Sequence, residues 1–158
     1  MNRKIRFGLS FLVIVAPFLL AACGGGGGGG VAPQPPAAPN VVTKFASLDN
    51  TQETTGSTST SLGFGVLALN TDTNGIAGFI VDNVAAGTAA HVHGPAARGV
   101  EAGVLVPLIG AGPGLWVLPD GAMLPAANEA DFNNGLLYYN VHTAVNPGGE
   151  IRGQIDLP

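Results

Sequence analysis

The chain has 158 residues, six Lys or Arg, ten Asp or Glu, and a net charge of −4 at pH 7. Three of the basic residues but none of the acidic ones lie in the first 22 positions, so residues 23–158 keep three basic and ten acidic residues and a net charge of −7. Nucleic-acid binding and docking on anionic lipid headgroups both need clustered Lys and Arg, so this balance argues against both.

The first 22 residues have the layout of a secretory signal peptide. Arg3, Lys4 and Arg6 form a basic start, and an almost wholly apolar stretch follows over residues 7–20. That stretch is shorter than the roughly 20 apolar residues that a membrane-spanning helix needs. We therefore expect residues 1–22 to be removed on export.

The sequence Leu20-Ala21-Ala22-Cys23 resembles the lipobox of bacterial lipoproteins, in which the cysteine thiol receives a diacylglyceryl group. We expect Cys23 to be lipidated and to hold the protein at a membrane, on the periplasmic face or the cell surface. The residue that follows is Gly24 rather than Asp, which resembles outer-membrane sorting. Cys23 is also the single cysteine, so no intrachain disulfide can form.

Residues 23–40 combine the lipidated cysteine with a linker of seven consecutive glycines followed by four prolines. Polyglycine is flexible and proline-rich sequence is extended, so neither half of the linker is expected to pack. The remaining residues, 41–158, have the size of one ordinary domain.

This domain has an all-β texture, because short apolar runs alternate with Gly, Pro, Asn and Asp clusters. Strands are predicted near residues 41–48, 62–69, 76–84, 89–93, 104–108, 115–118, 136–142 and 150–156. The Asn- and Asp-rich segment 70–75 is a turn that pairs the second and third strands. We expect an antiparallel Greek-key or immunoglobulin-like β-sandwich of about eight strands.

One short helical turn is predicted near residues 128–134. Asn128 is a candidate N-cap, the acidic residues Glu129 and Asp131 favour the N-terminal end of a helix dipole, and Gly135 is a stop signal.

Three stretches stand out: residues 90–96 (AHVHGPA), 135–143 (GLLYYNVHT) and 146–154 (NPGGEIRGQ). Together they resemble the chordin (CHRD) domain, which pairs an H-[IV]-H-G-P-A stretch with an N-V-H-T-x-x-N-P-G-G-E-I-R-G-Q ending. The resemblance covers about residues 42–157. It implies a β-sandwich, in agreement with the strand pattern, and no established enzymatic activity.

The last two stretches form a predicted hairpin. The period of two places Tyr138, Asn140 and His142 on one face of the strand and Tyr139 on the other. The turn between the strands is a structural one, in which proline and glycines supply the required backbone angles; it consists of Asn146, Pro147, Gly148 and Gly149.

All three histidines of the chain fall in these motifs. His91 and His93 are two residues apart and so share a face, and His142 lies on another predicted strand. An H-x-H pair with a third imidazole from a neighbouring strand suits zinc or copper. The alternative is that the rings only bond carbonyls or carboxylates at the sheet end.

Three further motif residues are candidates for the surroundings of this site. Glu150 is a candidate acceptor for an imidazole N–H, and Arg152 and Asn140 lie in the same motifs. The His91-Val92-His93 segment also resembles a copper-ligand strand of Cu/Zn superoxide dismutases, but the further histidines, zinc-binding Asp and cysteine pair of that pattern are missing. Trp116, Tyr138 and Tyr139 are predicted to be packing residues.

Two functions remain open at this point. The first is a lipid-anchored binding or interaction module of the cell envelope, with an unknown protein or envelope partner. The second is a copper- or zinc-binding protein that uses His91, His93 and His142, with a possible redox role. A nucleophile elbow, a P-loop and a dinucleotide fingerprint are all missing from the sequence, so we do not expect an enzyme.

Overall fold

A computed structural model describes residues 37–157 of the chain. The predicted signal peptide, Cys23 and the linker up to residue 36 lie outside the described residues. The described part contains nine strands: β1 (Val41–Leu48), β2 (Gly63–Asn70), β3 (Ile76–Asp82), β4 (Gly87–His93), β5 (Val104–Pro107), β6 (Ile109–Gly112), β7 (Leu115–Val117), β8 (Tyr138–Thr143) and β9 (Ile151–Gln154).

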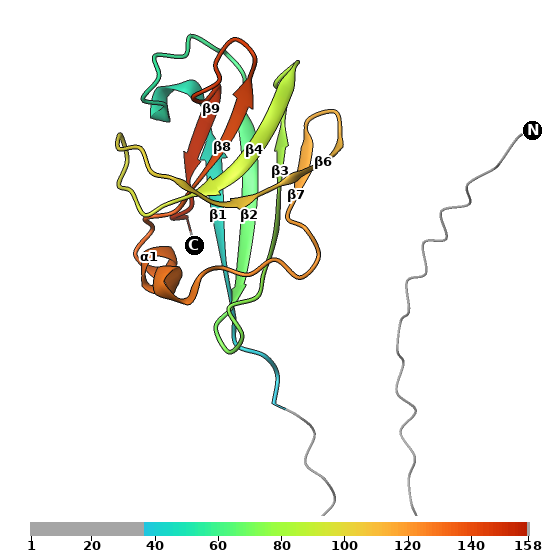
Figure 1. The fold of residues 1–158 in the computed structure, drawn as a ribbon, viewed down its shortest axis with the longest axis vertical. Coiled ribbons are helices and arrows are strands. Elements are labelled where there is room, and N and C mark those ends of the chain that lie inside the picture. Colours follow the sequence, from blue (N-terminus) through green and yellow to red (C-terminus); the bar gives the residue numbers. More distant parts are fainter. Residues whose placement is uncertain (1–36, 158) are drawn as a thin grey trace, which may run out of the picture. The chain divides into compact units, whose positions relative to one another are not determined.

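The strands form two antiparallel sheets that face each other (Figure 1). The five-stranded sheet has the order β1-β2-β3-β7-β6, and the four-stranded sheet has the order β5-β4-β8-β9. The chain crosses from one sheet to the other after β3, after β5 and after β7. The predicted all-β sandwich is therefore confirmed.

The predicted turn between β2 and β3 forms by side-chain bonding to the backbone. Asn70 Oδ1 accepts hydrogen bonds from the backbone N–H groups of Asp72 and Thr73, at 2.9 and 3.2 Å. Asn74 takes a positive φ of 59°, which asparagine tolerates better than most residues. As expected, β2 and β3 pair in antiparallel register over seven residue pairs.

The strand prediction missed β6. Its sequence, Ile-Gly-Ala-Gly, has no alternation of apolar and polar side chains, and it lies between the strands predicted near residues 104–108 and 115–118. It pairs with β7 through backbone groups. Two short 3-10 helices were also not predicted: η1 (Asn50–Gln52), capped by the Asp49 side chain, and η2 (Ala126–Asn128).

The predicted helical turn is present as α1 (Glu129–Asn133), next to η2. Gly135 follows it with a φ of 69°, as a stop residue should. Asn128 occupies the N-cap position of α1, as predicted, but its side chain makes no bond to the helix N–H groups and instead donates to Asp131 Oδ2, at 2.8 Å.

The core lies between the sheets, and Tyr139 of β8 is its largest hydrophobic residue. Its ring lies against Gly65 of β2, and its hydroxyl donates to the Val66 carbonyl at 2.8 Å. A Cβ atom at Gly65 would approach the ring to 2.6 Å, so glycine is needed there. Tyr139 thus packs against the opposite sheet only because β2 has no side chain at this point.

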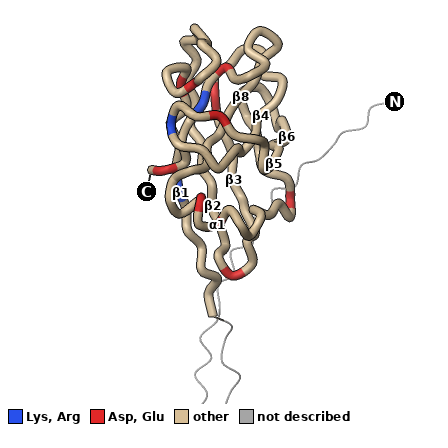
Figure 2. Tube along the Cα trace, turned by 60° about the vertical axis from the view of Figure 1, so that its left-hand side comes forward, with Lys and Arg blue, Asp and Glu red and all other residues tan. Residues whose placement is uncertain are grey.

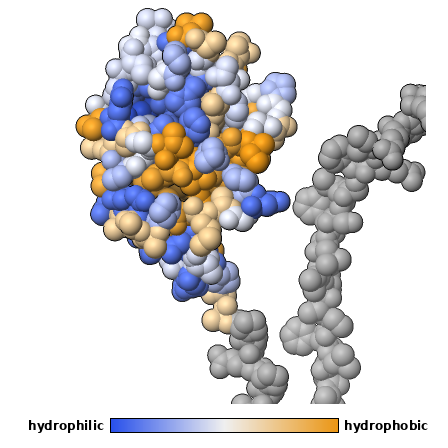
Figure 3. Space-filling view, in the orientation of Figure 1, coloured by the Kyte–Doolittle hydropathy of each residue, from blue (hydrophilic) through white to orange (hydrophobic). Residues whose placement is uncertain are grey.

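The outer face of the four-stranded sheet is covered by two loops, residues 53–62 and 94–103. All six residues of β8 are consequently buried, including the polar ones that point away from the core. Figure 3, which views this side, shows hydrophilic residues over its upper part and a hydrophobic band across the middle. Within residues 37–157, no helix is both long and apolar enough to cross a membrane.

Candidate metal centre

The three histidines meet on the outer face of the four-stranded sheet. His91 and His93 come from β4, and His142 comes from the neighbouring strand β8. One ring nitrogen from each residue lies within 4.8 Å of the other two, and the Nδ1 atom of His91 is 2.9 Å from the Nε2 atom of His142. The predicted convergence of the three rings is therefore present.

Two backbone carbonyls fix the orientation of two of these rings. His93 Nδ1 lies 3.0 Å from the Ala102 carbonyl oxygen, and His142 Nδ1 lies 3.1 Å from that of Pro147. Because a carbonyl only accepts, both Nδ1 atoms carry the proton and both Nε2 atoms keep a free lone pair. Metal-bound histidines are held in this way, by a hydrogen bond from the other ring nitrogen.

The lone pair of His93 Nε2 has no partner in the described part of the chain. That atom is buried and accepts no hydrogen bond. His142 Nε2 faces His91, whose Nδ1 must donate to it when no ion is present. One buried ring nitrogen of the cluster is thus left unsatisfied among the described residues.

Burial keeps all three imidazoles neutral. It lowers the pKa of His91 and of His93 below the usual value. It also lowers the pKa of His142, to about 4, with a further contribution from the charges that His91 and His93 would carry. Neutral imidazole is the form that binds metal ions.

The spacing of the nitrogens fits a small transition-metal ion. Bonds of about 2.0–2.1 Å in tetrahedral directions place two ligand nitrogens about 3.3 Å apart. The nitrogens here lie between 2.9 and 4.8 Å from one another, so shifts of less than about 1 Å per ring would suffice. Three neutral nitrogens with a fourth position open suit zinc and copper.

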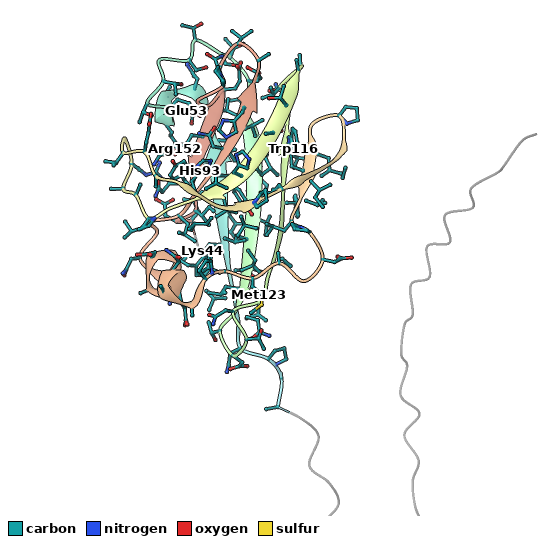
Figure 4. The ribbon with its side chains drawn as sticks, in the orientation of Figure 1. Lys44, Glu53, His93, Trp116, Met123 and Arg152 are labelled. Atoms are coloured by element: carbon teal, nitrogen blue, oxygen red, sulfur yellow. The ribbon has the colours of Figure 1, made fainter. Side chains whose placement is uncertain are left out.

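A buried arginine supports the ring of His93 from behind. The His93 ring stacks on Tyr138, with ring centroids 4.9 Å apart, and Arg152 Cζ lies 3.6 Å from the Tyr138 centroid. The two partners reach Tyr138 from the strands on either side of β8. Figure 4 shows His93, Arg152 and Glu53 in the same part of the fold.

Arg152 also fastens loop 94–103 over the site. Its Nη1 donates to the Val100 carbonyl at 2.8 Å, and its Nη2 donates to the Ala97 carbonyl at 3.1 Å. The same loop supplies the Ala102 carbonyl that orients His93. Arg152 was predicted to lie near the site, and it acts there through Tyr138 and the loop.

Glu53 is a buried acid beside this cluster that the sequence did not reveal. Burial raises its pKa to about 7, although the charge of Arg152 acts in the opposite direction. Its Oε1 atom and Asn140 Oδ1 are both buried acceptors without a hydrogen bond. A side-chain hydrogen bond from Asn140 also acts to lower the pKa of Glu53, against the larger effect of burial. Asn140 therefore adjoins Glu53, and no hydrogen bond joins it to an imidazole.

Glu150 does not take the place predicted for it. Its Oε2 atom accepts from Thr143 Oγ1, at 2.9 Å, and from Asn146 Nδ2. The acceptors for the imidazole N–H groups are backbone carbonyls instead. Glu150 thus stabilises the 143–150 turn, and this turn presents the Pro147 carbonyl to His142.

The residues of the 146–149 turn form a backbone hydrogen bond and also pack closely against a loop. Gly149 N donates to the Asn146 carbonyl at 3.1 Å. A Cβ atom at Gly148 would come within 2.7 Å of Thr55, and one at Gly149 within 2.5 Å of Glu53. Both glycines are required because loop 53–62 lies directly on them.

The two predicted packing aromatics Trp116 and Tyr138 have polar contacts too. The Trp116 indole, on β7, donates to Asp82 Oδ2, on β3, at 3.0 Å, so this contact lies in the five-stranded sheet. The Tyr138 hydroxyl bonds the backbone of Ala102. The strand period of two places Tyr138 on the same face as His142, and this pattern predicts that Tyr138 lies beside the histidines.

Searches of the curated proteins and of the solved structures found no match. A family model described as the CHRD domain matches residues 45–155, which is well over half of the chain and includes every strand after the start of β1. The motifs that pointed to this family are those that carry the three histidines, and the chain belongs to the CHRD domain family.

Proposed function

We propose that this chain is a lipid-anchored, extracytoplasmic CHRD module that binds a zinc or copper ion through His91, His93 and His142. The observation that carries the proposal is the convergence of the three rings, together with a buried nitrogen of His93 that has no partner among the described residues. A purely structural histidine cluster would need no unpartnered buried nitrogen.

The chemistry of the ligands supports the binding of an ion. Three neutral imidazoles leave the full charge of the ion in place and one coordination position free. His91 is only partly buried, which gives an ion a route into the site. Membership of the CHRD family suggests a binding or interaction module, and we propose binding rather than catalysis.

Ion binding is tested on residues 37–158, a compact unit that contains both sheets and the whole described core. Titration calorimetry and elemental analysis with Zn²⁺ and Cu²⁺ should give one ion per chain. An ion present at 100 times its dissociation constant should stabilise the fold by about 2.7 kcal/mol.

Matched variants separate this site from incidental binding. His142→Gln and His93→Gln should weaken binding by at least about 10²-fold. Asp120→Asn removes an exposed carboxylate outside the cluster and should leave the affinity unchanged. Absence of binding in the wild-type chain, or equal binding in all four proteins, would refute the proposal.

The membrane anchor rests on the Leu20-Ala21-Ala22-Cys23 motif and is tested separately. In a bacterial host that processes lipoproteins, the full chain should incorporate labelled palmitate and sediment with membranes. Cys23→Ser should do neither. A wild-type chain that is exported but remains unlabelled would contradict the anchor and leave the ion site unaffected.

A further inference from the structure

The outer face of the five-stranded sheet carries no charged side chain. The strand registers place Phe64 and Val66 of β2, with Phe79 and Val81 of β3, on this face. It continues across the neighbouring strands with further apolar residues: Phe45 of β1, Leu115 and Val117 of β7, and Ile109 of β6. An antiparallel sheet that faces water normally carries polar residues on that side.

This apolar face is continuous and open. Phe64 lies beside Val81 and Val66 beside Phe79 in the register, and the Phe45 and Phe64 rings stack with centroids 5.9 Å apart. The exposed fractions are 45% for Phe64, 37% for Phe79, 44% for Val81 and 55% for Ile109. These four residues together expose on the order of 350 Å², which is the size of a functional patch on a small protein.

The two sheets therefore differ on their outer faces. The four-stranded sheet has its polar outer side chains buried under loops 53–62 and 94–103. The five-stranded sheet has apolar side chains on its outer face, and several of them are exposed. Because exposed aromatic and branched residues on a flat sheet are costly in water, the second face is built to be covered.

Charge decides among the surfaces that could cover it. The part of the chain after residue 22 has three basic residues, coloured blue in Figure 2, and each is engaged elsewhere. Lys44 donates to carbonyls of α1, Arg98 pairs with Asp156, and Arg152 is buried in the opposite sheet. No basic rim is therefore available to draw this acidic domain onto an anionic membrane.

We propose that this face is the interface of a homodimer, with a second copy of the chain as its occupant. An uncharged, flat surface is complementary to itself, and two sheets pack face to face at about 10 Å with their strands about 30° apart. A two-fold axis would bring the same residues of both copies together. With the partly exposed neighbours included, the pair would bury roughly 1,000 Å², near the lower limit for a specific interface.

The test is the mass of residues 37–158 in solution, measured by sedimentation and light scattering from about 5 to 500 μM. EDTA is present throughout, so that an ion shared between copies cannot join them. A reversible dimer is expected within this range. His93→Gln should dimerise like the wild type, because the interface does not depend on the ion site.

Variants assign the dimer to this face. Val81→Glu should shift the dissociation constant at least 30-fold toward monomer, and the milder Val81→Thr should shift it in the same direction by a smaller factor. Val145→Glu is the matched control, because Val145 is 86% exposed and lies in the 143–150 turn, outside the patch. Circular dichroism confirms that each variant is folded.

Three results would overturn the proposal. The first is a wild-type chain that stays monomeric at 500 μM. The second is a dimer that persists in both folded Val81 variants. The third is a monomer that binds neutral phosphatidylcholine vesicles through Val81, which would make lipid the occupant.

Discussion

Replacing Arg152 with lysine should both destabilise the domain and weaken ion binding. Lysine keeps the positive charge but cannot form the planar stack on Tyr138 or donate to the Val100 and Ala97 carbonyls together. Loss of one buried hydrogen bond to a charged group costs about 1.5–3 kcal/mol, and loss of the stack costs about 1–2 kcal/mol. We therefore expect a decrease of about 3 kcal/mol in the free energy of unfolding.

The same change should act on the ion site through loop 94–103. The loop carries the Ala102 carbonyl that orients His93, so a loosened loop should lower the affinity for Zn²⁺ about 10-fold or more. Urea unfolding gives the stability, amide hydrogen exchange reports on the loop, and calorimetry gives the affinity.

Arg98→Lys is the control within the same loop, since Arg98 is exposed and its guanidinium bonds Asp156 and Gln52 Oε1 at the surface and not the loop's own carbonyls. Such a pair contributes at most about 1 kcal/mol, and this variant should bind ions normally. If Arg152→Lys leaves both stability and amide exchange in the loop at wild-type values, Arg152 does not fasten the loop and the reasoning fails.

Three further changes have defined outcomes. Gly65→Ala should cost about 2–3 kcal/mol in urea unfolding, because the new methyl group meets the Tyr139 ring, and the cost should shrink in a Tyr139→Ala background. Glu53 has a pKa raised by burial to about 7, so the folded chain holds this proton more tightly than the unfolded chain. Its contribution to stability is therefore fully present below about pH 4.5 and is lost as the pH rises to 7. After allowance for solvent screening, this loss of stability is about 1–2 kcal/mol. The free energy of unfolding of the wild type should therefore fall by this amount, relative to that of Glu53→Gln, between pH 4.5 and 7.5. His93→Leu should change the stability of the ion-free domain by no more than about 1 kcal/mol. The variant loses the hydrogen bond to Ala102 but also removes an unsatisfied buried nitrogen. Stabilisation of the fold by added Zn²⁺ should disappear. A large loss of stability without ion would favour a structural role for His93.

The sandwich could be predicted because most strands alternate or are bounded by turn residues. The 70–75 turn is an example in which the side chain that marks the turn in sequence also makes its hydrogen bonds. Strand β6 could not be predicted, because the Ile-Gly-Ala-Gly sequence gives no period and the strand exists through its pairing with β7.

The ligand set could be predicted for a similar reason: the strand period puts His91 and His93 on one face, and His142 lies in the second motif. The groups that orient the imidazole rings could not be predicted from the sequence. They are backbone carbonyls, which every residue has, so no residue type marks Ala102 or Pro147. Glu150, the acidic residue that the motif placed nearest to the histidines in sequence, accepts a hydrogen bond from Thr143 in the turn instead.

Burial of the site could not be predicted either. Tyr138, Asn140 and His142 alternate with apolar residues, which ordinarily indicates a strand with one face in water. Here loops 53–62 and 94–103 fold back over that face and bury it. Glu53 belongs to the first of these loops, and its perturbed carboxyl group exists only because of that closure.

The covering of one outer face gives the histidine cluster its chemical character. On an open sheet, water would bond each imidazole, and binding an ion would mean displacing that water. Under the loops, two N–H groups are paired with carbonyls and the His93 lone pair is left without a donor. An unpaired buried nitrogen costs about 1–3 kcal/mol, a cost that coordination to an ion would remove. The ion-binding role proposed for the cluster thus depends on the buried lone pair of His93 and on the loops that cover it.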